Sequence, residues 1–370
     1  MENTKQEKYI NSKCPNCGSE LHFLPNSLKT QCESCGSTFS IESLGRGKLD
    51  DEEENLDEVL KKIDEHKVAQ KVQRTIHCSD CGGLIYLNER TVATKCPFCG
   101  SNRVVDENKS QDIIDIKGVI PFVIKEDEVR THFKEWIRKR FFAPSKFKKG
   151  ILSPSYAAFY IPYYTFDSDT YTKYTGERGD DYTVTRTIKT KDGTRTVTET
   201  RTKWTFVSGS FAMYFDDVLV LGTNNILNGY IRKISNYDFN KMEKYQEQFM
   251  LGYSAEKPSV SLRDGFTQGK NQMENTIRSE CVRRIGGDRY RNLNYHVNYS
   301  NVTFKEIMAP IYNGSYEYQN KKYNFVCNGQ NGKFSGKFPI SAIKVSILVI
   351  LIIALVVGLS ILLYIFSKGW

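Results

Sequence analysis

Histidine is scarce in this sequence, and the short motifs that define common enzyme classes are missing. Among 370 residues there are five scattered histidines, and no segment has the form G-x-S-x-G, H-E-x-x-H or the glycine fingerprint of dinucleotide-binding proteins. The nearest approach to a phosphate-binding loop, from Gly265 to Asn271, is one residue short and ends in asparagine. These absences argue against hydrolase, metalloprotease, oxidoreductase and helicase functions, and we expect no catalytic residues.

The first residues also lack the apolar run of a secretory signal, because Met1 to Lys13 is polar and charged. The ten cysteines are therefore expected in a reducing compartment. In that setting thiols bind metals or pack in the core, and do not form disulfides.

One long segment has no charged residue at all. From Val345 to Phe366 the chain has 22 uncharged, mostly apolar residues. At about 1.5 Å per residue, a helix of this length spans roughly 33 Å, which is enough to cross a bilayer. We predict one transmembrane helix over 345–366. A buried core helix is the alternative, although core helices are seldom apolar on all sides over this length.

The residues on either side of this span predict its orientation. Lys333, Lys337 and Lys344 precede it with no acidic residue between Phe325 and Lys344, and only Lys368 follows it. The positive-inside tendency then favours a cytosolic N-terminal side. We expect a single-pass protein of the inner (cell) membrane with a C-terminal anchor in the lipid bilayer and the bulk of the chain in the cytoplasm.

Cysteine pairs of the form C-x2-C occur four times, in two matching sets. The unit C-x2-C-G-x13-C-x2-C-G appears twice, and the second copy begins 64 positions after the first, which indicates an internal repeat. We assign the copies to zinc ribbons at 10–42 and 74–106. The eight cysteines are Cys14, Cys17, Cys32, Cys35, Cys78, Cys81, Cys96 and Cys99.

This spacing is typical of structural zinc sites. Two intervening residues let a tight turn present both sulfurs to one ion, and the following glycine lets the backbone leave the turn at positive φ. Four thiolates close the coordination shell, so we predict two structural Zn²⁺ ions. Disulfides and an iron centre are the competing interpretations. Cys281 and Cys327 stand outside the pairs, and we expect them to pack in the core.

Charge patterning marks a linker between the ribbons. Acidic residues open the segment 49–73 and lysines close it, which complements a helix dipole and predicts a solvated helical linker. The whole chain carries a net charge of +9. A basic balance suits either anionic lipid headgroups or nucleic acid phosphates.

Residues 113–340 read as an α+β domain weighted toward antiparallel sheet. Five apolar residues recur at helical spacing and predict one buried helix face: Val129, Phe133, Trp136, Ile137 and Phe141. Further helices are expected near 239–250 and 262–285. Carboxylate pairs such as Asp216-Asp217 are interpreted as turn residues or surface charge.

A basic cluster without any acidic residue follows the first of these helices. Solvated charge is the ordinary interpretation, and contact with phosphates or lipid headgroups is the alternative. Its members are Arg138, Lys139, Arg140, Lys146, Lys148 and Lys149.

A hairpin is predicted over 182–203, with Asp192-Gly193 as its turn. Pairing outward from that turn sets Ile188 opposite Val197 and Thr187 opposite Thr198. Neither face is apolar enough for a core, so the hairpin should project into solvent.

Several phrases, joined to the cysteine pairs and the final span, support a resemblance. They are IKEDEVRTHFKEWI, YIPYYTFDSDTYTKYTGERGDDY, YFDDVLV and SNVTFKEIMAPIY. Together they resemble a bacterial family of transcription-factor-IIB-type zinc-ribbon-containing membrane proteins, some of which carry the label primosomal protein N′, a helicase. Some members look like membrane partners encoded beside phage-shock-protein-A-like and flotillin-like proteins in envelope-stress operons. The resemblance implies an anchor that recruits a peripheral protein.

The expected function is therefore a membrane-anchored cytosolic scaffold or adaptor that binds protein partners at the inner membrane face. The alternative is a membrane-tethered zinc-ribbon protein that binds nucleic acid through its ribbons. An unknown enzyme class ranks third.

Overall fold

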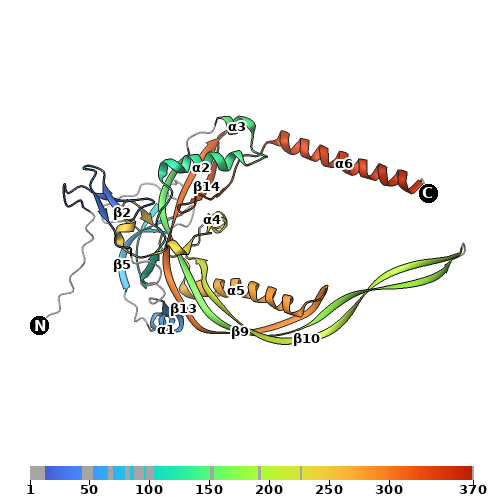
Figure 1. The fold of residues 1–370 in the computed structure, drawn as a ribbon. Coiled ribbons are helices and arrows are strands. Elements are labelled where there is room, and N and C mark those ends of the chain that lie inside the picture. Colours follow the sequence, from blue (N-terminus) through green and yellow to red (C-terminus); the bar gives the residue numbers. More distant parts are fainter. Residues whose placement is uncertain are drawn as a thin grey trace.

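The computed structural model describes most of the chain and has a mixed α+β architecture (Figure 1). Its described residues are 13–43, 53–65, 70–79, 84–86, 96, 104–112, 114–150, 154–190, 193–225 and 227–368. Within them, three sheets and six α-helices follow one another along the chain.

The largest sheet has nine strands and is mainly antiparallel. Its central path runs in the order β10-β9-β13-β14-β15, and four short strands join its sides. The five strands of the path are β9 (Ser155–Thr190), β10 (Gly193–Leu221), β13 (Arg289–Tyr318), β14 (Lys321–Asn328) and β15 (Phe334–Gly336). The four joining strands are β4 (Glu54–Asn55), β8 (Ile116–Val119), β11 (Glu243–Lys244) and β12 (Ser254–Ala255).

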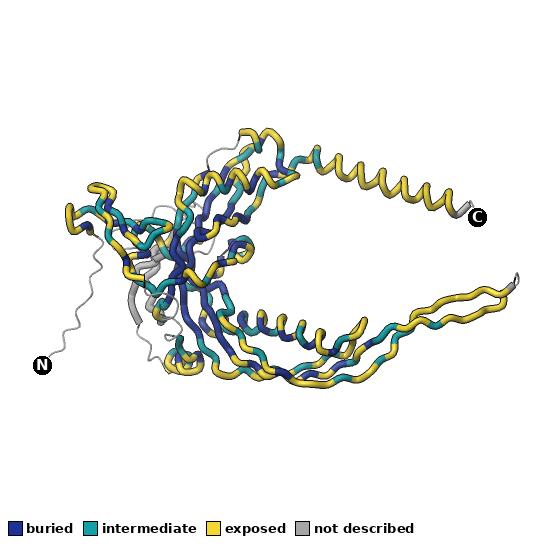
Figure 2. Tube along the Cα trace, in the orientation of Figure 1, coloured by how far each residue is buried: buried dark blue, intermediate teal, exposed yellow. Residues whose placement is uncertain are grey.

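The core lies where β9 and β13 run beside each other. Pairing sets Phe159 opposite Ile311, Ile161 opposite Ala309 and Phe166 opposite Phe304. All six side chains are buried, and Figure 2 shows the buried stretch in the middle of the molecule. Apolar residues on both faces of these strands mean that the sheet is covered on both sides here.

The predicted helix at 262–285 is confirmed as α5 (Leu262–Ile285). The Ser261 side chain accepts a hydrogen bond from the Asp264 backbone N–H, and Gly286 ends the helix at φ +67. Gly269 lets α5 lie close against Phe166, since a Cβ there would stand 3.1 Å from that ring. Farther along, Ile277 and Cys281 pack into the cluster of Tyr174 and Phe211 on the two long strands.

The prediction of a helix near 239–250 is wrong. The segment forms two 3₁₀ turns, Phe239–Lys241 and Glu247–Met250, on either side of β11. An unpredicted helix, α4 (Asn228–Ile234), comes before them. Asp238 accepts a hydrogen bond from the backbone N–H of Asn240, which favours a turn over a continuous helix.

The helix predicted from Val129, Phe133, Trp136, Ile137 and Phe141 is α2 (Glu126–Arg138), and it is followed by the short α3 (Ser145–Lys149). Val129, Phe133, Trp136 and Ile137 are buried as predicted. The prediction for Phe141 is wrong, because the helix ends before it and its side chain is 68% exposed.

The first cysteine set belongs to a three-stranded sheet of β1 (Leu21–Leu24), β2 (Lys29–Cys32) and β3 (Thr38–Ser40). This sheet is docked on the body of the molecule. The Phe23 N–H donates to the Leu251 carbonyl at 2.9 Å, and the rings of Phe23 and Phe249 lie 5.4 Å apart.

The region of the second cysteine set contains a sheet in the order β6-β5-β7. Its strands are β5 (Gln70–Cys78), β6 (Leu84–Tyr86) and β7 (Val104–Asp112), all antiparallel. Since β5 begins at Gln70, the expected helical linker does not reach residue 73.

The linker helix is shorter than expected and is not a solvated spacer. α1 covers Leu56–Asp64, and Leu56 and Val59 are buried among Tyr164, Phe166 and Phe304. The charge pattern described the exposed face of this helix correctly, but two apolar residues suffice to dock the other face.

The hairpin of β9 and β10 is confirmed, but its predicted register is wrong by two residues. Val197 lies opposite Arg186, and Thr198 lies opposite Thr185. A shift of two residues keeps every side chain on the same face, so the threonine-rich tip does not resist it. The register is set where Phe166 and Val220 enter the core, far from the turn.

The hairpin extends well beyond the rest of the sheet. β13 stops pairing with β9 at Gly179, so residues 180–190 and 193–203 pair in the sheet with each other alone. At about 3.3 Å per residue this free arm reaches about 36 Å. Figure 2 shows that it is mostly exposed, as predicted.

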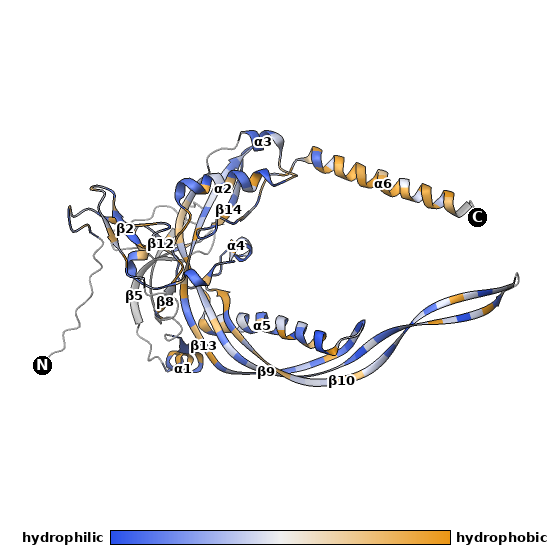
Figure 3. Ribbon diagram, viewed as in Figure 1, coloured by the Kyte–Doolittle hydropathy of each residue, from blue (hydrophilic) through white to orange (hydrophobic). Residues whose placement is uncertain are grey.

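The C-terminal segment forms α6 (Ala342–Lys368). A stretch of 25 residues, Ala342–Phe366, is long and apolar enough to cross a membrane, and none of it is buried. Figure 3 shows this helix as a continuous apolar rod that leaves the body beside α3. It is a candidate membrane anchor, and full exposure rules out the core-helix alternative in this fold.

Docking of α1 gives a direct test. Leu56→Ala should lower the free energy of unfolding by about 2–5 kcal/mol, because it leaves a cavity against Tyr164 and Phe304. Lys62→Ala, on the exposed face of the same helix, should change it by less than about 0.5 kcal/mol. Urea unfolding of the detergent-solubilised protein measures both. Equal, small effects would mean that α1 is a free spacer.

Candidate metal centre and a buried ion cluster

Four cysteines from the first set meet at one end of the β1–β3 sheet. The sulfurs of Cys14, Cys17, Cys32 and Cys35 all lie within 4.8 Å of one another. The Cys14 and Cys35 sulfurs are 3.6 Å apart, and those of Cys17 and Cys32 are 3.5 Å apart. Tetrahedral zinc with Zn–S bonds of 2.3 Å needs sulfurs about 3.8 Å apart. The residues therefore fit a four-coordinate metal ion such as zinc.

Two equivalent turns build this cluster. The Gly18 N–H donates to the Cys14 carbonyl at 2.8 Å, and the Gly36 N–H donates to the Cys32 carbonyl at 2.9 Å. Both glycines have φ +74, a conformation that other residues rarely adopt. The predicted role of these two glycines is confirmed.

The surroundings favour the thiolate form that a metal requires at Cys17 and Cys35. At Cys32 a backbone hydrogen bond from Cys35 lowers the pKa, but burial and the hydrogen bond with the Cys17 thiol outweigh it and raise that pKa to about 11. Hydrogen bonds with the side chain and backbone of Ser37 lower the pKa of Cys35 to about 6. Hydrogen bonds with Ser19 likewise lower the pKa of Cys17. Both of these cysteines are exposed, whereas Cys14 and Cys32 are buried. Four sulfurs fill a tetrahedral shell, so a bound zinc ion would have no open position for water and would be structural.

The second cysteine set is described only in part. Cys81 and Cys99 lie outside the described residues, so the assembly of a second metal site is not evident. Cys78 and Cys96 are buried in the cluster around Ile120 and Phe159. One backbone pairing occurs at equivalent positions of both cysteine sets. Lys13 pairs with Glu20 in the first set, and His77 pairs with Leu84 in the second, 64 positions later; both pairings are antiparallel.

The two solitary cysteines are core residues, as predicted. Cys281 packs with Tyr174 and Phe211, and Cys327 packs with Phe133 and Phe325. Burial raises the pKa of both thiols. They are therefore poor metal ligands and poor nucleophiles.

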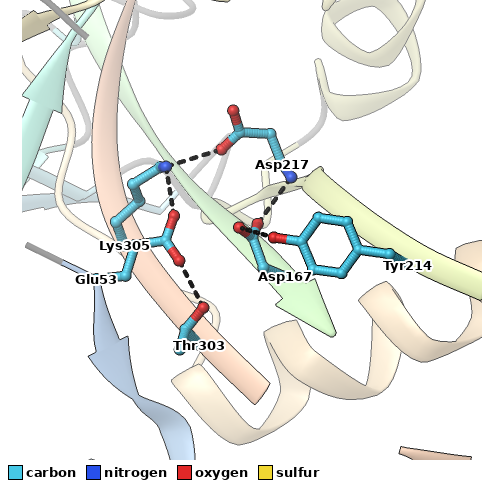
Figure 4. Close-up of polar contacts among 6 residues, drawn as sticks. All are labelled: Glu53, Asp167, Tyr214, Asp217, Thr303 and Lys305. Atoms are coloured by element: carbon cyan, nitrogen blue, oxygen red, sulfur yellow. Dashed lines mark hydrogen bonds and ion pairs between the residues drawn. The ribbon is translucent and has the colours of Figure 1, made fainter. Parts of the chain in front are cut away.

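A second polar cluster, which sequence reasoning missed, lies between β4, β9, β10 and β13 (Figure 4). The Lys305 ammonium contacts Glu53 at 2.7 Å and Asp217 at 3.0 Å. Thr303 donates to the other oxygen of Glu53 at 2.5 Å. Asp167 accepts hydrogen bonds from the Asp217 backbone N–H at 2.7 Å and from the Tyr214 hydroxyl at 3.2 Å.

Burial and charge shift the pKa values in this cluster. Burial raises the pKa of Asp167 to about 6, with a further contribution from the Glu53 carboxylate. Burial alone would lower the pKa of Lys305, but the carboxylates of Glu53 and Asp217 outweigh it and hold that pKa above its ordinary value. Lys305 is thus a permanent buried cation.

Oxygens of Glu53, Asp167 and Asp217 lie within 4.8 Å of one another, as ligands of a metal would. Here the ammonium group of Lys305 already supplies the positive charge beside them. We interpret the cluster as a structural ion network. It ties the segment before α1 to the strand bulge at Phe215/Val218.

The interpretation of Asp216-Asp217 as surface charge is wrong for its second residue. Asp217 sits at φ +51 beside that bulge and forms an ion pair with buried Lys305. The available signal was the Lys305-Glu306 pair inside an otherwise apolar strand, since buried charges need partners.

Comparison with known proteins gives one informative similarity. The chain is 27% identical over 340 residues to a protein of Bacillus subtilis (strain 168) named as the uncharacterized protein YdjG. The alignment covers 91% of this chain and 92% of that protein. No family model matches the chain. No solved structure matches it either.

Metal content tests the four-cysteine cluster. Cys14→Ser should reduce the zinc bound per chain by one ion, because three sulfurs and a hydroxyl bind zinc far more weakly than four thiolates. Cys281→Ala, which removes a buried thiol outside the cluster, should leave the zinc content unchanged. Elemental analysis after gel filtration measures both. Unchanged zinc in Cys14→Ser would contradict the site.

The raised pKa of Asp167 predicts a pH-dependent stability. The folded state holds this proton more tightly than the unfolded state, so the stability due to Asp167 is greatest at low pH and is lost as pH rises toward 6. In Asp167→Asn the amide oxygen can still accept from the Asp217 N–H, and the amide NH2 can donate to the Tyr214 hydroxyl, without the charge. The variant should gain stability relative to the parent between pH 4 and pH 7, by up to roughly 3 kcal/mol.

Thermal unfolding of both proteins across that pH range measures the difference. Asp169→Asn, at an exposed position on the same strand, is the matched control and should follow the parent closely. A stability difference for Asp167→Asn that stays constant with pH would contradict the assignment.

Proposed function

We propose that this protein is a membrane-anchored scaffold whose folded part binds a protein partner at the inner face of the cell membrane. The observation that carries the proposal is α6, in which a stretch of 25 residues is long and apolar enough to cross a membrane and has no buried residue. Apolar residues at the centre of a membrane helix each favour insertion by about 0.3–0.6 kcal/mol, so this helix is far more stable in a bilayer than in water.

We place the folded part on the cytosolic side. Lys333, Lys337 and Lys344 precede the uncharged run 345–366, whereas only Lys368 follows it, and no acidic residue follows Glu317. Free thiols at the four-cysteine cluster also suit a reducing compartment. The anchor is then single-pass and C-terminal.

We assign structural roles to zinc and no catalytic role to the chain. Cys14, Cys17, Cys32 and Cys35 would hold one ion, which fixes the small β1–β3 sheet on the body. The second set would hold another. Cys78 and Cys96 are buried, as are Cys14 and Cys32 at the equivalent positions of the first set, which supports equivalent roles for the two sets.

The free arm of the hairpin, residues 180–190 and 193–203, is the surface we assign to the partner. It offers a row of exposed threonines with Thr187 paired to Thr196 and Thr185 paired to Thr198. The arm and α6 leave the body on the same side (Figure 1), so the arm is directed toward the membrane that α6 would enter. The partner we assign to it is a phage-shock-protein-A-like or flotillin-like protein, in an envelope-stress response.

Nucleic acid is the second candidate, and the composition of the same arm favours it. Between Val184 and Thr198 the chain has four basic residues and one acidic residue. Basic side chains on an exposed ribbon can contact phosphates, and such binding weakens as salt increases.

Shortening the arm tests the proposal. Replacing residues 183–200 with Asn-Gly places a two-residue turn between Tyr182 and Arg201. These two residues pair with each other in the parent protein, so the register of the remaining hairpin is kept. Chemical cross-linking in native membranes, followed by mild detergent extraction, should recover a phage-shock-protein-A-like or flotillin-like protein with the parent chain. Recovery should fall about tenfold with the short arm, a loss of about 1.4 kcal/mol.

Zinc content and membrane retention of the short-arm variant are the controls, and both should match the parent. Equal recovery of the partner with the parent protein and with the short-arm variant would show that the arm does not bind the partner. Recovery of neither protein with the parent would contradict the scaffold proposal. Salt-sensitive retention of DNA or RNA would favour the second candidate.

A further inference from the structure

The corner between α2 and α3 presents a large apolar side chain to solvent. Phe141 is 68% exposed, although the residues before it on α2 are buried. Ile340 and Ile343, at the start of α6, are 64% and 73% exposed. Apolar side chains that gather on a surface mark contact sites in water-soluble parts of proteins.

Hydrogen bonds fix this corner to the root of α6. The Lys344 ammonium donates to the Phe141 carbonyl at 3.0 Å and to the Ala143 carbonyl at 2.8 Å. The Ser341 N–H donates to the Phe142 carbonyl at 2.8 Å. The same ammonium lies 5.7 Å from the centre of the Phe141 ring.

This attachment determines where the corner lies when α6 crosses a bilayer. The uncharged run of α6 begins at Val345, directly after Lys344. Lys344 then sits at the boundary between headgroups and hydrocarbon, as basic residues at helix ends commonly do. Phe141 is held beside it, within reach of one lysine side chain.

From Arg138 to Lys149 every charged residue of the corner is basic. Arg138, Lys139, Lys146 and Lys149 are exposed, and no acidic residue occurs between Glu135 and Asp167. The chain from Tyr318 to its end also has no acidic residue. Basic groups close to an anionic membrane surface are attracted to its headgroups.

Other basic residues of the cluster already have structural contacts. Lys148 donates to the Arg138 carbonyl at 2.8 Å and so ties α3 to the end of α2. The Arg140 guanidinium lies 5.1 Å from the Trp136 ring and 5.5 Å from the Phe338 ring. These contacts make the corner rigid, while the four exposed side chains are left for an external partner.

We propose that the α2–α3 corner is a second membrane contact, in which Phe141 enters the interface and Arg138, Lys139, Lys146 and Lys149 bind anionic phospholipid headgroups. The inference rests on α6 as a membrane anchor. It adds a defined orientation, because two contacts on a rigid corner restrict how the body tilts over the bilayer. Continuity with α6 and charge complementarity select lipid as the occupant.

Fluorescence quenching tests this contact in the full-length protein. Phe141→Trp places a reporter at the corner, and Phe206→Trp places one at a position on β10 that is also 68% exposed. Each variant is reconstituted in nanodiscs whose lipids carry bromine on the acyl chains, with either zwitterionic or anionic headgroups. The emission of the parent chain is subtracted, since it has three tryptophans.

The emission of Trp at position 141 should be roughly halved in anionic nanodiscs, because an interfacial side chain lies within about 5–10 Å of the acyl boundary. The reporter at position 206 should be quenched much less. Lys146→Glu with Lys149→Glu should restore most of the emission at position 141. Lys61→Glu with Lys62→Glu makes the same charge change on α1 and should have no effect.

Incorporation of the chain into nanodiscs reports on the anchor separately from the corner. Incorporation with equal quenching at positions 141 and 206 would overturn the proposal and leave the anchor intact. Quenching that is the same in zwitterionic and anionic lipid, or that survives the Lys146 and Lys149 changes, would overturn the role of the basic residues.

Discussion

The structure depends on the pairing of β9 with β13 through the middle of the largest sheet. Phe159, Phe166, Phe304 and Ile311 are buried there, and the clusters that hold α1, α5 and the β1–β3 sheet include side chains of these two strands. Four parts of the protein that pack near this pair are far apart in the sequence: the β1–β3 sheet, α1, α5 and the α2–α3 corner at the start of α6. They are brought together because each has an apolar surface that the sheet alone can cover.

Two clusters of ionisable side chains join N-terminal segments to the rest of the protein, the ion network at Lys305 and the four-cysteine cluster. The ion network at Lys305 satisfies a cation inside the sheet with two carboxylates, Glu53 from the segment before α1 and Asp217 from β10. The four-cysteine cluster gathers four sulfurs that one metal ion would coordinate. Both arrangements hold N-terminal segments against the body, because a charge left without its partner in either place would be costly.

The proposed function follows from how rigid parts meet a membrane. A helix alone would fix the protein to a bilayer but would leave the body free to tilt. Lys344 and Ser341 join that helix to the α2–α3 corner, and the hairpin arm leaves the body on the same side. An anchored body with a fixed tilt presents its exposed surfaces to a partner in a constant orientation, which a recruiting scaffold can use.

The sequence by itself determined the features that depend on local chemistry. The glycines after Cys17 and Cys35, the ends of α5 and the apolar run of α6 are all encoded by neighbouring residues, so they could be predicted. The second cysteine set stays a prediction, since Cys81 and Cys99 lie outside the described residues.

Only the tertiary structure decided features that depend on distant partners. The hairpin register was set by Phe166 and Val220 in the core. A shift of two residues keeps every side chain on the same face of the sheet, so the alternation of residue types cannot reveal it. Lys305 meets Glu53 across 252 positions, and Phe141 is exposed because the helix ends before it beside the root of α6. Local patterns specify which face is apolar, but packing decides what covers it.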